Sequence, residues 1–423
     1  MLAFWLSALS LSTISALALS GGVVTSTDNL GRTICSVKAI GGGQDDGPNI
    51  NAAFQYCSSN GRVVLDGYYV VDTLLFTTEL SDVEIELSGT VQYTPDIAKW
   101  SPQSYYMTYQ NATTYWFLSG NNIHLYGGGT LDSNGQVWWD AFATNSNAGT
   151  AGGSSRTFAR PVPLTVGNAT NVLIEDLTQI GSPFWNNFVY QSSYVTYRGI
   201  NISSVSYSSN PTANSDGWDI YRSSYITITN STINNDDDCV SFKPNSTNII
   251  VSDLHCNGSH GISVGSLGQY AGETDIVANI SASNIVMRNA QNGARIKVFG
   301  GSPYANSTAG GGTGYVKNIT FSNFQVENVD YPIYINQCYS TTASVCAQYP
   351  STLSISDVHY YNITGTSSGH EGALVADLEC SAECQDITAS GTSLSSPNGT
   401  AAYTCKNIAT VSELDFNCTA PAS

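Results

Sequence analysis

Three consecutive aspartates, Asp236 to Asp238, stand beside Cys239 in a chain of 423 residues of which only 11% are charged. Carboxyl groups a few ångströms apart cannot all ionise, because each negative charge raises the pKa of its neighbours above the usual value of about 3.9. We therefore expect this group to keep a proton at mildly acidic pH. A protonated carboxyl beside an ionised one supplies the general acid and general base that glycosidic cleavage requires.

Two more reactive residues stand at equal sequence intervals on either side of this group. Asp216, in NSDGWD (214–219), is as far before Asp238 in the sequence as His260, in GSHG (258–261), is after it. Residues one coil apart in a stacked-strand structure lie roughly 4.8 Å apart. If one coil has the length of this interval, these three side chains form one column, with Asp237 close by.

A basic pair follows, which we expect two coils beyond His260. Arg295 and Lys297, in ARIKV (294–298), are two residues apart and share one face of a strand. Such a pair can bind a carboxylate. The combination indicates an acidic sugar as substrate, bound by the cations and cleaved by the carboxyl groups.

Each feature taken singly has an ordinary structural explanation. Aspartate runs are commonly solvated turns, and three aspartates could also bind Ca²⁺. A single histidine is usually structural, and an isolated Arg-x-Lys is unremarkable. The joint spacing of five residues, in step with a repeat, favours the catalytic interpretation.

The repeat is visible as alternating Val, Ile and Thr segments that begin with Asn or Tyr. The second residues of successive segments are positions 172, 195, 226, 249, 276, 316 and 353, and we expect them to stack on one another, with one strong strand per coil. Leucine-rich repeats and propellers need other signatures. The pattern predicts an all-β, right-handed parallel β-helix whose coils stack along one axis. The segment 44–57 predicts a short helix with Pro48 in its first turn, covering the N-terminal end.

The first residues predict export. Residues 1–18 read as a secretory signal peptide, which leaves 19–423 as a single catalytic domain. The ten cysteines favour disulfides between sequence neighbours: 35 with 57, 239 with 256, 338 with 346, 380 with 384, and 405 with 418. Sequons such as Asn111 and Asn318 agree with a secreted, extracellular glycoprotein.

Charge limits the partners. The net charge of −18 and the small number of Lys and Arg residues argue against nucleic acid or membrane partners. Histidine is rare and no CxxC pair occurs, so zinc is not expected, and we expect no metal or other cofactor. A monomer is expected.

Taken in order, NSDGWD, DDC, GSHG and RIK resemble the four signature motifs of the polygalacturonase family of glycoside hydrolases. The likeness extends from DDGPNINAAF (45–54) to the C-terminal cysteine pairs. The resemblance implies that Asp237 is the general acid, that Asp216 and Asp238 hold the attacking water, and that the anomeric configuration is inverted. It further implies that His260 orients the acid, while Arg295, Lys297 and Tyr339 bind the galacturonate.

Longer stretches, 242–249 and 257–270, are most similar to the fungal exo-acting members, which remove terminal galacturonic acid. Three positions depart from the usual pattern, namely Ser215, Asp236 and Ser259. An extra carboxylate at Asp236 also occurs in relatives acting on xylogalacturonan, so endo- or exo-hydrolysis of xylogalacturonan or rhamnogalacturonan is an alternative. A calcium-dependent pectate lyase and a non-catalytic carbohydrate-binding β-helix are more distant alternatives.

Overall fold

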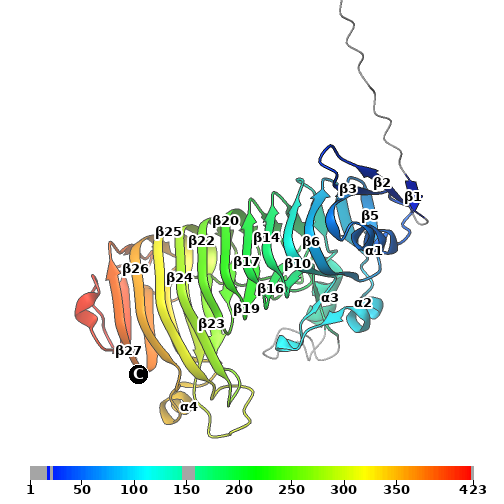
Figure 1. Ribbon diagram of the computed structural model, residues 1–423. Helices are drawn as coiled ribbons and strands as arrows, with labels where there is room; N and C mark the ends of the chain where they lie inside the picture. Colours follow the sequence, from blue (N-terminus) through cyan, green and yellow to red (C-terminus); the bar gives the residue numbers. More distant parts are fainter. Residues whose placement is uncertain (1–16, 20–21, 145–157, 421–423) are drawn as a thin grey trace, which may run out of the picture.

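The computed structural model describes residues 17–19, 22–144 and 158–420, which wind into the expected right-handed parallel β-helix (Figure 1). Most of its strands form one sheet system in which successive coils pair in parallel, and three short strands form a second sheet. The expected signal peptide, residues 1–18, lies outside the described residues except for Leu17 and Ala18 in β1. No described helix is long and apolar enough to cross a lipid bilayer.

The elements follow one another along the chain without a break in the pattern. The N-terminal coils contain β1 (Leu17–Leu19), β2 (Val23–Thr27), β3 (Thr33–Val37), α1 (Gly47–Tyr56), β4 (Ser59–Leu65), β5 (Tyr68–Val71), β6 (Leu75–Leu87), β7 (Thr90–Tyr93), α2 (Ile97–Gln103), β8 (Tyr105–Tyr106), η1 (Tyr109–Asn111), β9 (Thr113–Thr114), β10 (Trp116–Tyr126), β11 (Thr130–Asp132) and α3 (Gln136–Thr144). The central coils contain β12 (Pro161–Val162), β13 (Leu164–Gly167), β14 (Thr170–Glu175), β15 (Thr178–Ile180), β16 (Asn187–Tyr190), β17 (Ser193–Arg198), β18 (Asn201–Ser203), β19 (Trp218–Tyr221), β20 (Ser224–Asn234), β21 (Val240–Phe242), β22 (Ser246–Asn257) and β23 (Ile262–Leu267). The C-terminal coils contain β24 (Thr274–Phe299), β25 (Thr313–Tyr339), α4 (Ala343–Gln348), β26 (Ser354–Ser367), β27 (Leu374–Ser390), β28 (Ser393–Ser395), β29 (Ala402–Ile408) and η2 (Val411–Glu413).

Apolar side chains stack in columns inside the coils. One column contains Val172, Val195, Ile226 and Ile249 in direct register, as the sequence predicts, and all four are buried. Each added coil removes further apolar surface from water, at roughly 25 cal/mol per Å². The core is therefore a line of stacked side chains instead of one central cluster.

The expected register is wrong in the last three segments. The column continues through Ile280, Ile319 and Val358, not through residues 276, 316 and 353. Strand β24 begins at Thr274, before the position that pairs with the earlier strands, so alternation alone does not locate the core residue. In every coil of this column, the residue just before the core residue has a positive φ, for example Asn279 at 60°.

The N-terminal end is covered by helix α1, as expected, at the blue end of Figure 1. Its buried face contains Ile50, Ala53 and Phe54. The carboxylate of Asp46, just before the helix, accepts hydrogen bonds from the backbone N–H of Ile40 and Val70. The cap is thereby tied to the first coils.

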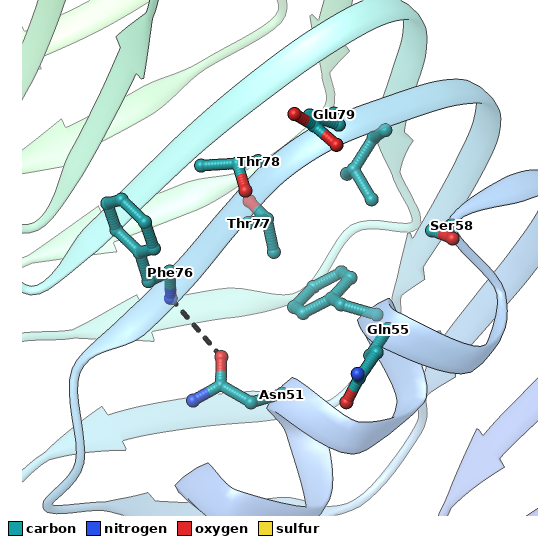
Figure 2. A pocket seen from close by; sticks show the side chains of 9 residues that line it. Asn51, Gln55, Ser58, Phe76, Thr77, Thr78 and Glu79 are labelled. Atoms are coloured by element: carbon teal, nitrogen blue, oxygen red, sulfur yellow. Dashed lines mark hydrogen bonds between the residues drawn. The ribbon is translucent and has the colours of Figure 1, made fainter.

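A pocket of about 450 Å³ lies between α1 and β6 (Figure 2). The side-chain oxygen of Asn51 accepts a hydrogen bond from the Phe76 backbone N–H at 3.2 Å, which joins the helix to the strand. Asp216, Asp237 and Asp238 do not line this pocket. The pocket is part of the N-terminal cap formed by α1.

All five expected disulfides are formed, and no cysteine among the described residues is free. They join Cys35 to Cys57, Cys239 to Cys256, Cys338 to Cys346, Cys380 to Cys384, and Cys405 to Cys418. The second bond ties the coil that follows Asp238 to the end of β22, which fixes the backbone next to the acidic residues.

Candidate active site

Short coils bring the expected acidic residues together. Trp218 pairs with Val240, and Val240 pairs with Ile262, so β19, β21 and β23 repeat at the same sequence interval as the acids. This register places Asp216 and Asp238 on successive coils. Ser263 pairs directly with Arg295, so the basic pair lies one coil beyond that of His260 and not two, because β23 and β24 are neighbours.

The three aspartates form a compact cluster. Asp216, Asp237 and Asp238 each place one carboxylate oxygen within 4.8 Å of the others. These nearest oxygens are closer than the separation of roughly 6.5–9.5 Å expected for the carboxyl groups of an inverting enzyme. The spacing is short because two of the residues are adjacent in the chain and the third lies one coil away.

Asp238 is fully buried and surrounded by donors. Lys297 Nζ lies 2.6 Å from Asp238 Oδ2, and Arg295 Nη1 lies 3.8 Å from Oδ1. The Ser263 hydroxyl donates to Oδ1 at 2.6 Å. The basic pair thus neutralises this carboxylate, and it also faces Tyr339, whose ring centre lies 5.7 Å from the Arg295 guanidinium.

Asp237 is the most accessible of the three, with a side chain that is 16% exposed. His260 Nδ1 lies 3.0 Å from Asp237 Oδ1. Asn214 donates to Oδ2 at 3.2 Å. Asp237 is therefore held on both sides while it still reaches solvent, as a group that protonates a bound substrate must.

The pKa values divide the cluster into protonated and ionised members. Burial, together with the charges of Asp219 and Asp237, raises the pKa of Asp216 well above the usual value. Burial opposes ionisation of Asp237 too, but the His260 charge and hydrogen bond outweigh it and hold the pKa of Asp237 below its usual value. The pKa of His260 is raised, since attraction to Asp237 exceeds the effect of burial.

The pKa of Asp238 is shifted in the same direction as the pKa of Asp237. Burial favours its neutral form, but Lys297, Arg295 and Lys243 together outweigh this, and the pKa of Asp238 is lowered. The raised pKa values of Asp216 and Asp236 favour their protonated forms and agree with the expectation that the acidic residues keep a proton. The lowered pKa of Asp237 favours its ionised form.

A second buried ion pair, absent from the sequence-based expectation, lies beneath the cluster. Lys243 Nζ is 2.8 Å from Asp219 Oδ1 and 3.8 Å from Asp216 Oδ2, and all three side chains are at least nine-tenths buried. The pattern Ser-x-Lys (241–243) repeats Arg-x-Lys (295–297), because Ser241, Ser263 and Arg295 share a register. This repetition is the signal that could have identified Lys243.

Arg160, from the run RPVPL, also reaches the site. Its buried guanidinium donates to the side-chain oxygen of Asn214 at 2.6 Å and to the backbone oxygen of Ala213 at 2.7 Å. Asn214 in turn contacts Asp237. Arg160 is a positioning residue that fixes the loop before Asp216.

The three departures from the family pattern all support the segment around Asp237. Asp236 accepts hydrogen bonds from the hydroxyl and the backbone N–H of Ser215, so two of the departures contact each other. The Ser259 hydroxyl donates to the backbone oxygen of Asp237 at 2.9 Å. The extra carboxylate therefore braces the neighbouring coil.

The aspartate cluster has the spacing of a metal site, but its surroundings favour ammonium groups. Calcium needs six to eight oxygen ligands, several of them carboxylates or carbonyls. Lys297 and Lys243 already lie 2.6 Å and 3.8 Å from Asp238 and Asp216. Two cations this close repel a divalent ion, so the residues do not fit a calcium site.

Aromatic side chains cover the strand face beside the cluster. Phe188 pairs with Asp219 one coil away and is buried. Tyr109, from η1, stacks on Tyr221 with ring centres 3.8 Å apart. Gln110 donates to Gln269 at 3.3 Å, which joins η1 to the loop after β23. Segment η1 therefore covers the strand face at Tyr221.

On the C-terminal side of the cluster, the next coil continues the strand face of the basic pair. Tyr334 and Asn336 continue the register of Arg295 and Lys297 and are partly exposed. The loop 300–312 and α4 project beyond this side, at the same edge as α2 and α3 (Figure 1).

Buried acids with raised pKa values give stability a defined pH dependence. Burial, opposed by Lys243, raises the pKa of Asp219 from 3.8 to about 7. A carboxyl group with a raised folded-state pKa stabilises the fold below its unfolded pKa, and this stability is lost as pH rises through the folded pKa. Asp216 and His260 act in the same direction. We expect the free energy of unfolding to fall between about pH 4 and pH 7.

Urea unfolding across this range tests the expectation. Asp219→Asn removes the titrating group and should flatten the slope, whereas Asp82→Asn, on a half-exposed side chain, should not. The lowered pKa values of Asp237 and Asp238 matter only below about pH 4, since their stabilisation is lost as pH falls through the folded pKa. A free energy of unfolding that rises from pH 4 to pH 7 would contradict the placement of the protons.

A parallel β-helix with a buried carboxyl cluster beside two cations is the arrangement expected of an enzyme that cleaves an acidic polysaccharide. Residues 60–415 match the glycosyl hydrolases family 28. The chain belongs to this family and is a glycoside hydrolase.

Similar proteins share nearly the whole chain. A probable exopolygalacturonase X of Aspergillus fumigatus is 46% identical over 392 residues, covering 91% of this chain and 88% of the relative. An exopolygalacturonase of Cochliobolus carbonum is 45% identical over 393 residues, covering 91% and 86%. The crystal structure of an endo-xylogalacturonan hydrolase from Aspergillus tubingensis is 32% identical with a TM-score of 0.81, covering 92% of this chain and all of that one.

Proposed function

We propose that the protein is an exo-polygalacturonase, which hydrolyses terminal galacturonic acid from polygalacturonan and oligogalacturonides of pectin. The observation that supports exo action is the stacking of Tyr109, from η1, on Tyr221, in the strand that follows Asp216. In this proposal η1 blocks the passage of an internal segment of galacturonan, so that only a chain end reaches the cluster. The two curated relatives named above carry the same activity in their names.

The cations supply substrate recognition in this proposal. Arg295 and Lys297 bind the sugar carboxylate, and Tyr339 forms part of the same subsite. A uronate on Lys297 competes with the charge that lowers the pKa of Asp237. Substrate binding therefore raises the pKa of Asp237 and prepares it to take up a proton.

The acids carry out the hydrolysis. His260 passes its proton along the 3.0 Å hydrogen bond to Asp237, which protonates the leaving oxygen as general acid. Asp216 and Asp238 hold the water, and Asp238, whose lowered pKa favours the ionised form, accepts its proton. We propose inversion at the anomeric carbon, which NMR of the first products measures directly.

The protein is proposed to work outside the cell as a monomer. The expected signal peptide and the five disulfides support export. Residues 19–423 would then form the single catalytic domain, without a cofactor.

Product analysis on polygalacturonate tests the exo assignment. We expect monomeric galacturonic acid from the first minutes with little loss of viscosity, and no unsaturated uronides. Tyr109→Ala, which removes the ring stacked on Tyr221, should increase the share of oligomeric products, whereas Tyr207→Ala, on a highly exposed side chain, should not. Rapid viscosity loss at low conversion would show internal cleavage and contradict the proposal.

Xylogalacturonan is the second candidate substrate. The Aspergillus tubingensis enzyme is named for that activity, and this chain has the extra carboxylate Asp236. Faster release of products from xylogalacturonan than from polygalacturonate would favour this candidate. The rate of product release from rhamnogalacturonan oligomers should be measured in the same way.

As a member of a hydrolase family, the chain is neither a lyase nor a non-catalytic binding protein.

A further inference from the structure

A pair of exposed tyrosines lies on a different sheet from the acidic cluster. Tyr194 and Tyr225 occupy neighbouring coils, in β17 and β20, whereas the acids flank β19, β21 and β23. Their rings are parallel within 2°, with centres 4.7 Å apart. About half of each side chain is exposed, 54% and 51%. The two rings thus form a flat apolar platform on the surface.

The backbone at these positions is unusual for tyrosine. The same column holds Asn or Asp in other coils, for example at positions 171, 248, 279, 318 and 357, where φ lies between 54° and 60°. Asn and Asp tolerate this left-handed region, whereas a bulky residue there is an outlier. Tyr194 and Tyr225 adopt φ values of 56° and 59°. Strain and exposure together carry a cost that the fold itself does not require.

The platform continues into a groove along the helix axis. Two shallow depressions of about 270 and 340 Å³ share Tyr225, Asn248 and Ile250. They extend to Asn318 and Thr320, across five coils, which corresponds to roughly 19 Å. The groove is long enough for several sugar rings in a row.

The walls of this groove are uncharged. Of the described residues that line the two depressions, none is Asp, Glu, Lys, Arg or His, in a protein with a net charge of −18. The amides form a ladder, with Asn279 donating to Asn248 and Asn318 donating to Asn279. Each amide still has a donor hydrogen and an acceptor lone pair available for a sugar hydroxyl.

We propose that this groove is a second carbohydrate-binding site, which holds an uncharged polysaccharide chain. The apolar face of a pyranose ring stacks on Tyr194 and Tyr225, and the amide ladder bonds the hydroxyls further along. Polygalacturonate is a poor occupant, because an anionic chain needs cations that this groove lacks. The site would anchor the enzyme to neutral glycans independently of hydrolysis.

Native affinity gels containing xyloglucan, β-1,4-galactan or polygalacturonate test the proposal. We expect at least one of the neutral polymers to retard the protein, and the Tyr194→Asn/Tyr225→Asn variant to bind at least about fivefold more weakly. Asparagine is the common residue of this column, so the variant should fold. Tyr68→Asn is the control, since Tyr68 is 55% exposed outside the groove. Release of galacturonic acid from soluble oligomers should be unchanged in both variants.

The chain's own glycans are the competing occupant, because Asn279 and Asn318 belong to sequons. The gels are therefore repeated after enzymatic removal of N-linked glycans, and the same tyrosine dependence is expected. No retardation by either neutral polymer, before or after this treatment, would overturn the proposal. Equal retardation of the double variant, or tyrosine-dependent binding of polygalacturonate, would also overturn it.

Discussion

Asp237→Asn should lower kcat on oligogalacturonides by about 10²–10⁴-fold, because the amide cannot protonate the leaving oxygen. Asp237 is the accessible carboxyl group of the cluster and contacts His260 at 3.0 Å. KM should change little, since the sugar carboxylate is bound by the cations. Steady-state kinetics, together with calorimetry of oligogalacturonate binding to the variant, measure both quantities.

Arg295→Gln provides the contrast to this variant. Loss of a charge-assisted hydrogen bond costs about 1.5–3 kcal/mol, or roughly 10–100-fold in kcat/KM, and here the change should appear mainly in KM.

If Asp237→Asn keeps more than about a tenth of kcat, Asp237 is not the acid. The proton on Asp216 would then be the remaining candidate, in agreement with its raised pKa.

Lys243→Met should lower the free energy of unfolding by about 3–5 kcal/mol near neutral pH, because it leaves buried carboxylates without their partner. Lys243 lies 2.8 Å from Asp219, whose side chain is completely buried. Urea unfolding followed by circular dichroism measures the loss. At pH 4 the loss should be smaller, since Asp219, with a pKa raised to about 7, is then protonated.

A double variant separates the charge from the packing of the lysine stem. In Lys243→Met/Asp219→Asn the unpaired charge is gone, so a large part of the lost stability should return. Lys406→Met is a surface control, because its partner Glu379 is partly exposed. Equal losses in the single and double variants would show that Lys243 acts through its contact with the Trp185 ring and not through its pairing with Asp219.

The sequence was a good guide to the fold wherever one apolar position marked each coil. Val172, Val195, Ile226 and Ile249 are in the expected register. The later coils were misaligned because long strands such as β24 alternate over many residues without a turn. The left-handed Asn, Asp or Tyr just before each core residue is the better marker, since the backbone there restricts the residue type.

The acidic cluster could be predicted because its members recur at an equal sequence interval. Asp216 and Asp238 differ by one coil, so spacing alone placed them together. Lys243 and Arg160 could not be found this way. Their roles depend on which neighbours bury them and on the direction of their side chains, and neither is specified by coil length.

The segment between Asp216 and Asp238 has the length of a single short coil, which sets the register of the two acids. An insertion or deletion of one residue in the strand between them would shift the phase of the acids and turn one of them away from the other. The loop 300–312 and the segment around α4, by contrast, protrude at the rim and can change length without disturbing this phase. Enzymes of this architecture can therefore diversify at the rim in the sugars they accept while the catalytic turn keeps a constant length.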